Sequence, residues 1–242
     1  MKLSICIPTY NREKHLQNCL QSINIASQCL DNSLKVEICI SDNFSSDETE
    51  AVVRNANLTL PVKYCKNKKN LGIPRNFLNV VDMAKGEFAW LIGDDDLLLP
   101  DAISRLYELI DDHPGVDFFY VNSFHLNTEY LDLYPAPFDT ANLPATMVPF
   151  SEWSSPGEMK FLDLIDPKIS FDFLGGMFLS VFKKSLWDQN IEALDRDAIY
   201  DNRTFSHFDN TFPHVKIFAN AFSDSLAYFN DKPMNVCLTG AR

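Results

Sequence analysis

The stretch EFAWLIGDDD, residues 87–96, places three carboxylates directly after an apolar run. Unbroken apolar character is typical of a strand that is buried on both faces of a parallel sheet. Adjacent carboxylates repel one another beside such a strand, so a cation is expected to compensate them. Oxygen ligands of this kind suit a hard divalent ion, Mg²⁺ or Mn²⁺. The alternative is a solvated acidic turn that caps the helix expected from Pro100.

Strand and helix patterns alternate on both sides of this stretch, through residues 1–121. Short β-branched or apolar runs predict strands at 3–8, 35–42, 62–65, 87–93 and 116–121. Helical spacing of apolar residues and helix-start signals predict helices at 12–26, 48–53, 74–84 and 100–110. Such alternation predicts an α/β fold of three layers, with a mostly parallel central sheet between helices.

Polar segments follow four of these strands. Ligands of parallel sheets bind beyond the carboxyl ends of the strands, so these segments are expected to converge on one crevice. They are residues 9–12, 42–47, 67–75 and 94–96. In the first, an aromatic ring, an amide and a guanidinium suit a base and its phosphates, and in the second Asp42 can accept a hydrogen bond from a nucleobase. Each segment also has a plainer interpretation as a turn or a helix cap.

Residues 122–242 are less regular. We expect a long loop or a partly extended excursion at 125–150, where four prolines occur. Ser155 and Glu158 form a capping-box pattern that predicts a helix to about residue 165. Gly175 and Gly176 precede a strand predicted at 177–182, and helices are predicted at 184–191 and 212–222. No repeat or linker separates the two parts, so one domain is expected over 1–242.

Charge is unevenly distributed. The chain has 21 basic and 33 acidic residues and a net charge of −12, which disfavours binding to nucleic acid. A local exception is a basic cluster whose members are Lys63, Lys66, Lys68, Lys69 and Arg75. It is either a solvated loop or a site for an anion such as a phosphate.

Cysteine usage and apolar patterning bear on the compartment. None of the six cysteines forms a CxxC pair, which favours a reducing cytoplasm over a disulfide framework. The N-terminal apolar run is too short for a signal peptide, and no stretch approaches the roughly 20 apolar residues of a membrane helix. A cytoplasmic protein is therefore expected.

Four motifs in this order resemble family 2 glycosyltransferases of GT-A fold. They are SICIPTYNRE at 4–13, ICISDNFSSDET at 38–49, NLGIPRNFLNV at 70–80 and KGEFAWLIGDDDLLLPDAI at 85–103. The GDDDLL and SDN forms are most similar to the bacterial abequosyltransferase-like subgroup. The resemblance implies that 1–121 binds a nucleotide sugar and that 122–242 binds the acceptor. It also implies a DXD-type motif and a Mn²⁺ or Mg²⁺ cofactor.

Residue roles follow from this resemblance position by position. Pro8, Thr9, Tyr10 and Arg12 would line the nucleotide pocket. Asp42 would contact the base, Arg75 the base or diphosphate, and Asp94 the ribose or the donor sugar. Asp95 would be the metal ligand, with Asp96 beside it. The family often has Asp where this chain has Gly93, which leaves the number of protein–metal bonds open.

The catalytic base is expected in the second half. The family's acidic ED-like motif is replaced here by FSHFDNTFPHV, residues 205–215. Asp209 is the first candidate for the base, His214 the second and His207 the third; the alternatives are a helix cap and structural histidines. Asp172, Gly175 and Gly176 are expected to bind the acceptor, or else to form an ordinary turn.

The resemblance predicts an inverting, metal-dependent glycosyltransferase. It would move a sugar from a UDP- or CDP-linked donor to a hydroxyl of a growing bacterial surface glycan, such as O-antigen, lipopolysaccharide or capsule. The acceptor is a glycan or a lipid-linked glycan, and peripheral contact with the inner face of the plasma membrane is implied by the family alone. The missing ED pair leaves open an inactive nucleotide-sugar-binding module. A nucleotidyltransferase is disfavoured because no Gly-rich basic loop follows the first strand.

Overall fold

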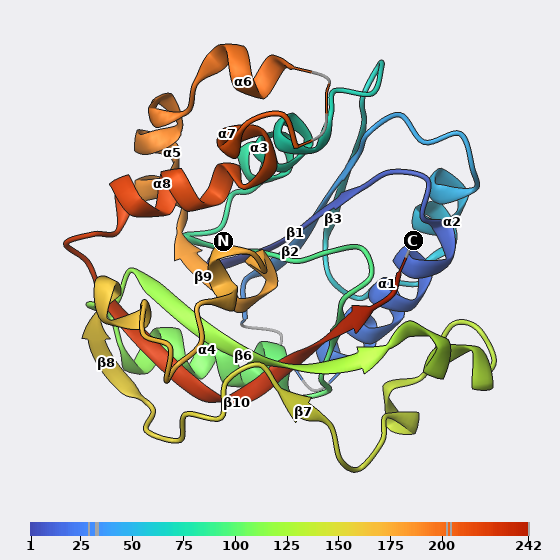
Figure 1. Cartoon of the computed structure of the whole chain (residues 1–242). Coiled ribbons are helices and arrows are strands. Elements are labelled where there is room, and N and C mark those ends of the chain that lie inside the picture. Colours follow the sequence, from blue (N-terminus) through green and yellow to red (C-terminus); the bar gives the residue numbers. More distant parts are fainter. Residues whose placement is uncertain (29, 32–33, 202, 204, 242) are drawn as a thin grey trace.

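The computed structural model describes residues 1–28, 30–31, 34–201, 203 and 205–241. A single sheet of ten strands crosses the molecule in the order β3-β2-β1-β4-β9-β6-β10-β5, with β7 beside β6 and β8 beside β10 (Figure 1). The long strands β1, β2, β3, β4, β6 and β10 run in one direction, whereas β9 runs antiparallel between β4 and β6. The predicted α/β fold with a mostly parallel sheet is confirmed.

The strands are bounded as follows: β1 Leu3–Thr9, β2 Val36–Asp42, β3 Val62–Lys66, β4 Phe88–Leu91, β5 Leu97–Leu98, β6 Phe118–Asn127, β7 Val148–Pro149, β8 Gly157–Lys160, β9 Ser180–Lys183 and β10 Leu226–Thr239. The α-helices are α1 Glu13–Ser27, α2 Thr49–Asn55, α3 Ile73–Met83, α4 Ala102–Asp112, α5 Lys184–Asn190, α6 Arg196–Tyr200, α7 Phe208–Thr211 and α8 Pro213–Ala221. Short 3₁₀ turns include η3 Phe161–Leu164, η4 Asp172–Leu174 and η5 Met177–Leu179.

Two apolar cores cover the two faces of this sheet. Every residue of β1 is buried, and neighbouring side chains point to opposite faces. Ile5 and Ile7 pack with α1 and α4, whereas Cys6 packs with the core that includes α3, α5 and α8. Figure 1 shows these two groups of helices on either side of the sheet. Burial on both faces explains why the first strands read as continuous apolar runs.

Parallel register brings the polar strand ends together. Thr9 lies opposite Asp42 across the β1–β2 pair, and Asp42 lies opposite Lys66 across β2–β3. Cys6 of β1 pairs with Leu91 of β4, whose chain continues into the three carboxylates. The expected convergence at one edge of the sheet is therefore observed.

Several predictions for the second half are wrong. The helix expected from Ser155 is instead β8, which pairs antiparallel with β10 at Glu158 and Tyr228, followed by η3. Pairing with a distant strand outweighs the local capping signal here. The strand expected at 177–182 begins only at Ser180, after η5. The fourteen-residue strand β10 was not among the predicted strands.

Residues 125–150 form a partly extended excursion, which was one of the two predicted alternatives. β6 continues to Asn127 and β7 returns to pair with it at Phe124 and His125. Among the helices of the described residues, none combines the length and apolar character that a membrane span requires.

Candidate functional site

A hollow of about 370 Å³ opens where β1 and β4 end. Pro8–Tyr10 and Arg12 line it from the first strand end, and Asp94 and Asp95 line it from the second. Ile73 of α3 adds an apolar wall. Six of the predicted nucleotide and metal residues thus share one hollow.

Asp94 is held at the back of this hollow. The Thr9 hydroxyl donates to Asp94 Oδ2 over 2.7 Å, and Arg12 lies 3.5 Å from Asp94 Oδ1. Burial raises the pKa of Asp94 to about 7, with the neighbouring Asp95 adding to the rise. A carboxyl group with a pKa near 7 loses its proton readily when a cation or a positive substrate group approaches.

Asp95 and Asp96 point in different directions. Asp95 Oδ2 accepts from Arg12 over 2.8 Å, and its side chain is 24% exposed toward the hollow. Asp96 is buried, and its Oδ2 accepts the Gly93 N–H over 2.6 Å. Burial raises the pKa of Asp96, and the Cys237 thiol also contacts this carboxyl group. Asp95 therefore faces the hollow, whereas Asp96 faces the strand end.

A side chain at position 93 would crowd the two carboxylates that follow it. A Cβ atom placed there would lie 2.5 Å from Asp95 Oδ1 and 3.1 Å from Asp96 Oδ2. Any larger residue at this position would therefore have to displace the two carboxylate side chains.

The donor set fits a divalent ion that completes its shell with substrate oxygens. The described residues contain no group of three or more His, Cys, Asp or Glu side chains arranged around a metal position. Asp95 nevertheless offers a hard oxygen ligand at the hollow, with the Asp94 carboxyl group beside it. Mg²⁺-type sites commonly use one or two carboxylates together with phosphate oxygens and water. The residues present therefore fit an ion shared with a diphosphate.

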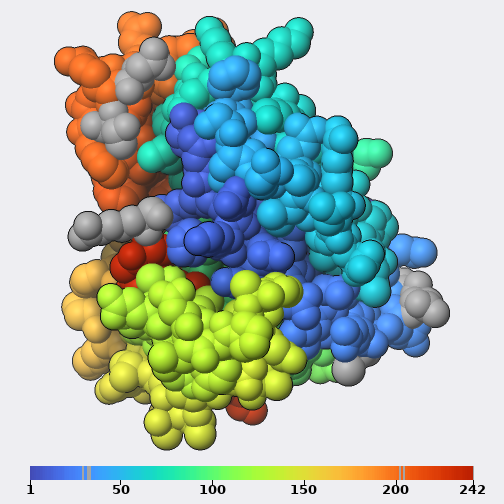
Figure 2. Space-filling view, turned by 90° about the vertical axis from the view of Figure 1, so that its right-hand side faces the viewer, coloured from blue at the N-terminus to red at the C-terminus, as the bar shows by residue number. Residues whose placement is uncertain are grey.

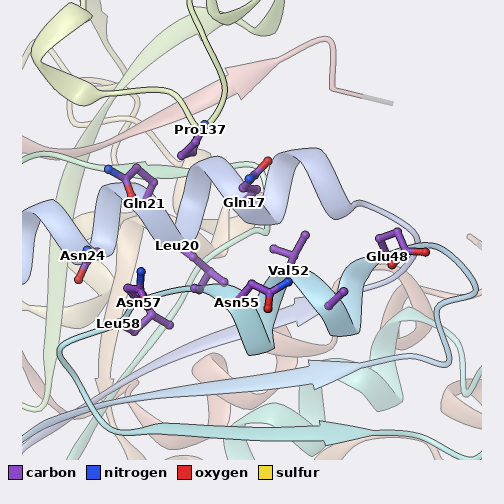
Figure 3. A pocket seen from close by; sticks show the side chains of 12 residues that line it. Gln17, Leu20, Gln21, Asn24, Glu48, Val52, Asn55, Asn57, Leu58 and Pro137 are labelled. Carbon is purple, nitrogen blue, oxygen red and sulfur yellow. The ribbon is translucent and has the colours of Figure 1, made fainter.

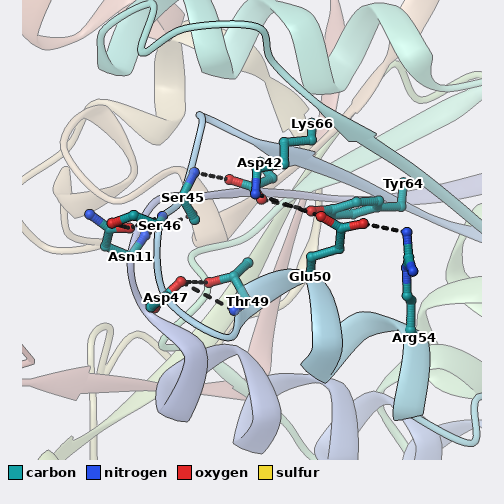
Figure 4. A network of polar contacts seen from close by, with 10 residues as sticks. All are labelled: Asn11, Asp42, Ser45, Ser46, Asp47, Thr49, Glu50, Arg54, Tyr64 and Lys66. Atoms are coloured by element: carbon teal, nitrogen blue, oxygen red, sulfur yellow. Dashed lines mark hydrogen bonds and ion pairs between the residues drawn. The ribbon is translucent and has the colours of Figure 1, made fainter.

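Both carboxylate oxygens of Asp42 already have hydrogen-bond partners within the protein. It is fully buried; Oδ1 accepts the Ser45 N–H over 2.7 Å, and Oδ2 accepts the Tyr64 hydroxyl over 2.7 Å (Figure 4). Burial and the hydrogen bond to Asp42 raise the pKa of Tyr64. Asp42 holds the loop that follows β2, and its predicted contact with a base stays a prediction.

The loops after β1 and β2 are tied to each other. The Asn11 N–H donates to Ser45 Oγ over 2.9 Å, and the Ser46 N–H donates to Asn11 Oδ1 over 2.7 Å (Figure 4). Asp47 accepts the Glu13 N–H and also caps the start of α2. These bonds fix the position of Arg12 in the hollow.

Asparagines near α3 were missed by the sequence analysis. Asn43 and Asn76 line the hollow. Asn43 Oδ1 accepts the Leu71 N–H over 2.8 Å, and Asn76 Oδ1 accepts the Ser41 hydroxyl over 2.7 Å. The repeated asparagines of NLGIPRNFLN were the available signal, but their partners come from β2.

Arg75 and the basic cluster lie outside the hollow. Arg75 Nε donates to the Leu71 carbonyl over 2.6 Å, and its guanidinium lies 4.8 Å above the Tyr200 ring. Lys63 donates to the Met83 carbonyl, and Lys66 lies 3.6 Å from Glu50. The predicted role of Arg75 near a diphosphate stays a prediction.

The first two candidate bases, Asp209 and His214, are buried on α7 and α8. Asp209 is 2% exposed and accepts from the Asp195 N–H over 2.7 Å and from Lys216 Nζ over 2.8 Å. Burial alone would raise the pKa of Asp209, but these two partners hold it below its ordinary value. His207, the third candidate, is exposed and caps α7.

His214 is more deeply enclosed. It is 1% exposed, and its Nε2 lies 3.0 Å from the Leu174 carbonyl oxygen. Burial lowers the pKa of His214 to about 4. Neither His214 nor Asp209 lines the hollow in the described structure.

The predicted acceptor residues lie next to the hollow, because the residue that follows them in the chain lines it. Asp172 is exposed in η4, and the Gly175 and Gly176 N–H groups both donate to its carbonyl oxygen. A Cβ at Gly176 would lie 2.8 Å from the Phe178 ring. Met177, the next residue, lines the hollow. The glycine pair thus forms a turn that brings the second half to the donor side.

A larger hollow of about 480 Å³ lies elsewhere, between α1 and α2. Figure 3 shows its uncharged amides, Gln17 and Gln21 from α1 and Asn55 and Asn57 around the end of α2. It contains no group of carboxylates or histidines, only Glu48. The smaller hollow at the strand ends is therefore the better candidate for chemistry.

Comparisons with known proteins give the family of the chain. Residues 4–185 match the family model described as glycosyl transferase family 2. The abequosyltransferase RfbV of Salmonella typhimurium is 31% identical over 251 residues, covering 98% of this chain and 66% of that protein. A Campylobacter jejuni GalNAc(5)-diNAcBac-PP-undecaprenol beta-1,3-glucosyltransferase is 30% identical, covering 76% of this chain and 52% of that protein.

Among solved structures, Staphylococcus aureus TarS 1-349 in complex with UDP-GlcNAc has a TM-score of 0.71 at 18% identity. The alignment covers 99% of this chain and 59% of that one, and the likeness confirms the predicted GT-A fold. This chain spans 52% to 66% of the length of these three proteins. The extent of the family match and the identity to RfbV confirm the predicted resemblance: the chain belongs to glycosyltransferase family 2.

Proposed function

We propose that this protein is an inverting, metal-dependent glycosyltransferase. Its donor would be a UDP- or CDP-linked sugar, and its acceptor a hydroxyl of a growing bacterial surface glycan such as O-antigen, lipopolysaccharide or capsule. The single observation that carries the proposal is the hollow in which Thr9, Arg12, Asp94 and Asp95 meet. Nucleoside diphosphates bind at this edge of a parallel sheet.

Each residue of the hollow has a defined task in this proposal. Pro8–Tyr10 and Arg12 bind the nucleotide, and Asp94, anchored by Thr9, accepts from the ribose or the donor sugar. Asp95 would hold the metal, whereas Asp96, the second predicted ligand, would have to give up its bond to the Gly93 N–H to join it. Bound Mn²⁺ or Mg²⁺ supplies positive charge that stabilises the departing diphosphate. Arg12, which lines the same hollow, would bind the phosphate oxygens with its guanidinium.

A base in the second half takes the proton of the acceptor hydroxyl. Asp209 remains our first candidate because Lys216 and the Asp195 N–H keep it ionised. Its use requires that Lys216 gives up its contact when the acceptor binds. His214 is the second candidate: it is neutral at pH 7, but it is 1% exposed and its Nε2 already lies against the Leu174 carbonyl oxygen. Asp172 and the Gly175–Gly176 turn would position the acceptor.

The relatives suggest the acceptor class and the compartment. A PP-undecaprenol acceptor in the name of the Campylobacter relative supports a lipid-linked glycan for this chain as well. We propose that the reaction takes place in the cytoplasm, at the inner face of the plasma membrane.

The test is thermal unfolding with UDP, CDP, GDP, dTDP and ADP, each with and without Mn²⁺. A ligand at a hundred times its Kd adds about 2.7 kcal/mol. For a chain of this size that raises the midpoint by roughly 5–10 °C. We expect a shift for one pyrimidine diphosphate that needs Mn²⁺ and is lost in Asp95→Ala. No shift with any nucleotide would refute the nucleotide-sugar proposal.

A second candidate is a nucleotide-sugar-binding module without catalysis. The observation that favours it is the enclosed state of Asp209 and His214, neither of which lines the hollow. Donor hydrolysis separates the two candidates, because slow release of the sugar to water requires a competent site. Nucleotide and Mn²⁺ binding without any hydrolysis or transfer would favour the module.

A further inference from the structure

Four aromatic side chains of one short segment are exposed together. Tyr200, Phe205, Phe208 and Phe212 are exposed by 62%, 74%, 54% and 36%. Tyr200 ends α6, and the Phe208 and Phe212 rings lie 6.0 Å apart along α7. Exposed aromatic side chains gathered within one short segment indicate a contact site, since burial of these rings within the fold would otherwise stabilise it.

Exposed lysines lie beside this segment. The loop between β3 and α3 carries Lys68 and Lys69, and neither makes an ion pair within the described part of the chain. Arg75, just after this loop, stacks over Tyr200 at 4.8 Å. Figures 1 and 2 both show the loop and the α6 region side by side along the upper edge of the molecule.

The charge balance of this edge differs from that of the whole chain, which is −12. Asp201 is paired with Arg203 at 2.7 Å, and Glu192 lies 3.9 Å from Arg196. The charges left without an ionic partner are those of Asp195, Asp197, Lys68, Lys69 and Arg75. Three unpaired cations therefore stand against two unpaired acids at this edge, and the cations come from the β3–α3 loop and the first turn of α3.

We propose that this edge docks on an anionic membrane surface. We call it the aromatic–lysine face, and it comprises Lys68, Lys69, Tyr200, Phe205, Phe208 and Phe212. Aromatic rings favour the headgroup level of a bilayer, and lysines favour anionic lipid phosphates. The proposal rests on the proposed function, in which the acceptor is lipid-linked.

The position of the face suits delivery of such an acceptor. Ile73, which is 45% exposed, lines the donor hollow and lies two residues before Arg75 on α3. The hollow therefore opens beside the face. An acceptor held in the membrane would reach the donor without leaving the bilayer surface.

The test is flotation of the purified chain with vesicles, with no donor or acceptor present. Vesicles of phosphatidylethanolamine with phosphatidylglycerol are compared with vesicles of phosphatidylcholine alone. We expect binding to the anionic vesicles. Lys68→Glu/Lys69→Glu is expected to weaken it at least about thirtyfold, and Phe205→Ser/Phe208→Ser about tenfold. Because the lysines act through charge, their contribution is expected to fall at high salt.

Matched controls use equally exposed residues outside the face. Leu133, 74% exposed, and Val148, 64% exposed, belong to the excursion that Figure 1 shows at the opposite edge. Leu133→Ser/Val148→Ser controls for loss of apolar surface, and Lys168→Glu/Lys232→Glu for loss of positive charge. Both controls are expected to bind vesicles like the unaltered chain, and unfolding midpoints check that all variants fold.

Three results would overturn the proposal. One is failure of the unaltered chain to float with the anionic vesicles. Another is equal binding by the face variants and their controls. The third is a dimer in light scattering that the Phe205→Ser/Phe208→Ser change dissociates, since the face would then contact a second copy. Because the assay contains no nucleotide, its failure leaves the thermal-unfolding test of donor binding unaffected.

Discussion

His214 offers a test of the buried second half through the pH dependence of stability. Its ring is 1% exposed, and burial lowers its pKa to about 4 from an ordinary value of 6.5. Below pH 6.5 the unfolded chain binds a proton at this position that the folded chain does not bind. The unfolded state then holds more protons, so the free energy of unfolding falls as the pH drops.

The expected loss is set by the gap between the two pKa values. At about 1.36 kcal/mol per pH unit, the gap between 6.5 and about 4 corresponds to about 3 kcal/mol. The loss develops between pH 6.5 and pH 4 and is complete below pH 4. This loss is a large share of the total free energy of unfolding, which is about 5–15 kcal/mol for a typical domain.

The assay is urea unfolding from pH 7 to pH 4 for the unaltered chain and for His214→Gln. The glutamine amide keeps a donor for the Leu174 carbonyl but does not titrate in this range. Other titrating groups affect both proteins alike, so the difference between the two curves isolates His214. The unaltered chain is expected to lose about 3 kcal/mol more than the variant. Parallel curves would refute the reasoning that burial keeps this histidine neutral.

Two further predictions concern buried contacts of the sheet. Gly86→Ala is expected to destabilise by about 1–3 kcal/mol or more, because a Cβ there would lie 2.6 Å from the Ser4 backbone nitrogen; Gly115→Ala, which meets nothing within 4 Å, is the control. Equal unfolding midpoints for the two variants would contradict this. Tyr64→Phe leaves one oxygen of the buried Asp42 carboxylate without its donor and is expected to cost about 1–3 kcal/mol in urea unfolding. No change in the urea midpoint would show that Asp42 does not depend on this bond.

Much of the donor half could be predicted because its signals are local. Apolar runs buried on both faces identify the strands, and Gly72 before Pro74 marks the start of α3. The strand-end rule then selects Thr9, Arg12, Asp94 and Asp95, and the structure brings these four together. Here local pattern and tertiary position agree.

The remainder depends on contacts between distant residues. β8 forms because β10, some seventy residues later, provides an edge for it, so the capping pattern at Ser155 misled the sequence analysis. The sequence suggests Asp42 and Asp96 as ligand-binding residues. In the structure, however, their carboxylate oxygens accept hydrogen bonds from Tyr64, Ser45 and Gly93. Sequence spacing cannot show which carboxylate oxygens are already occupied.

The most direct test of the central claim is Mn²⁺ binding measured by electron paramagnetic resonance, with UDP or CDP present. The signal of free Mn²⁺ falls as the ion binds to the protein. Asp95, which faces the hollow, is compared with Asp96, which faces Gly93. Nucleotide-dependent binding that Asp95→Asn abolishes is the result that the account predicts. Equal Mn²⁺ binding by the unaltered chain and Asp95→Asn, with or without nucleotide, would contradict it.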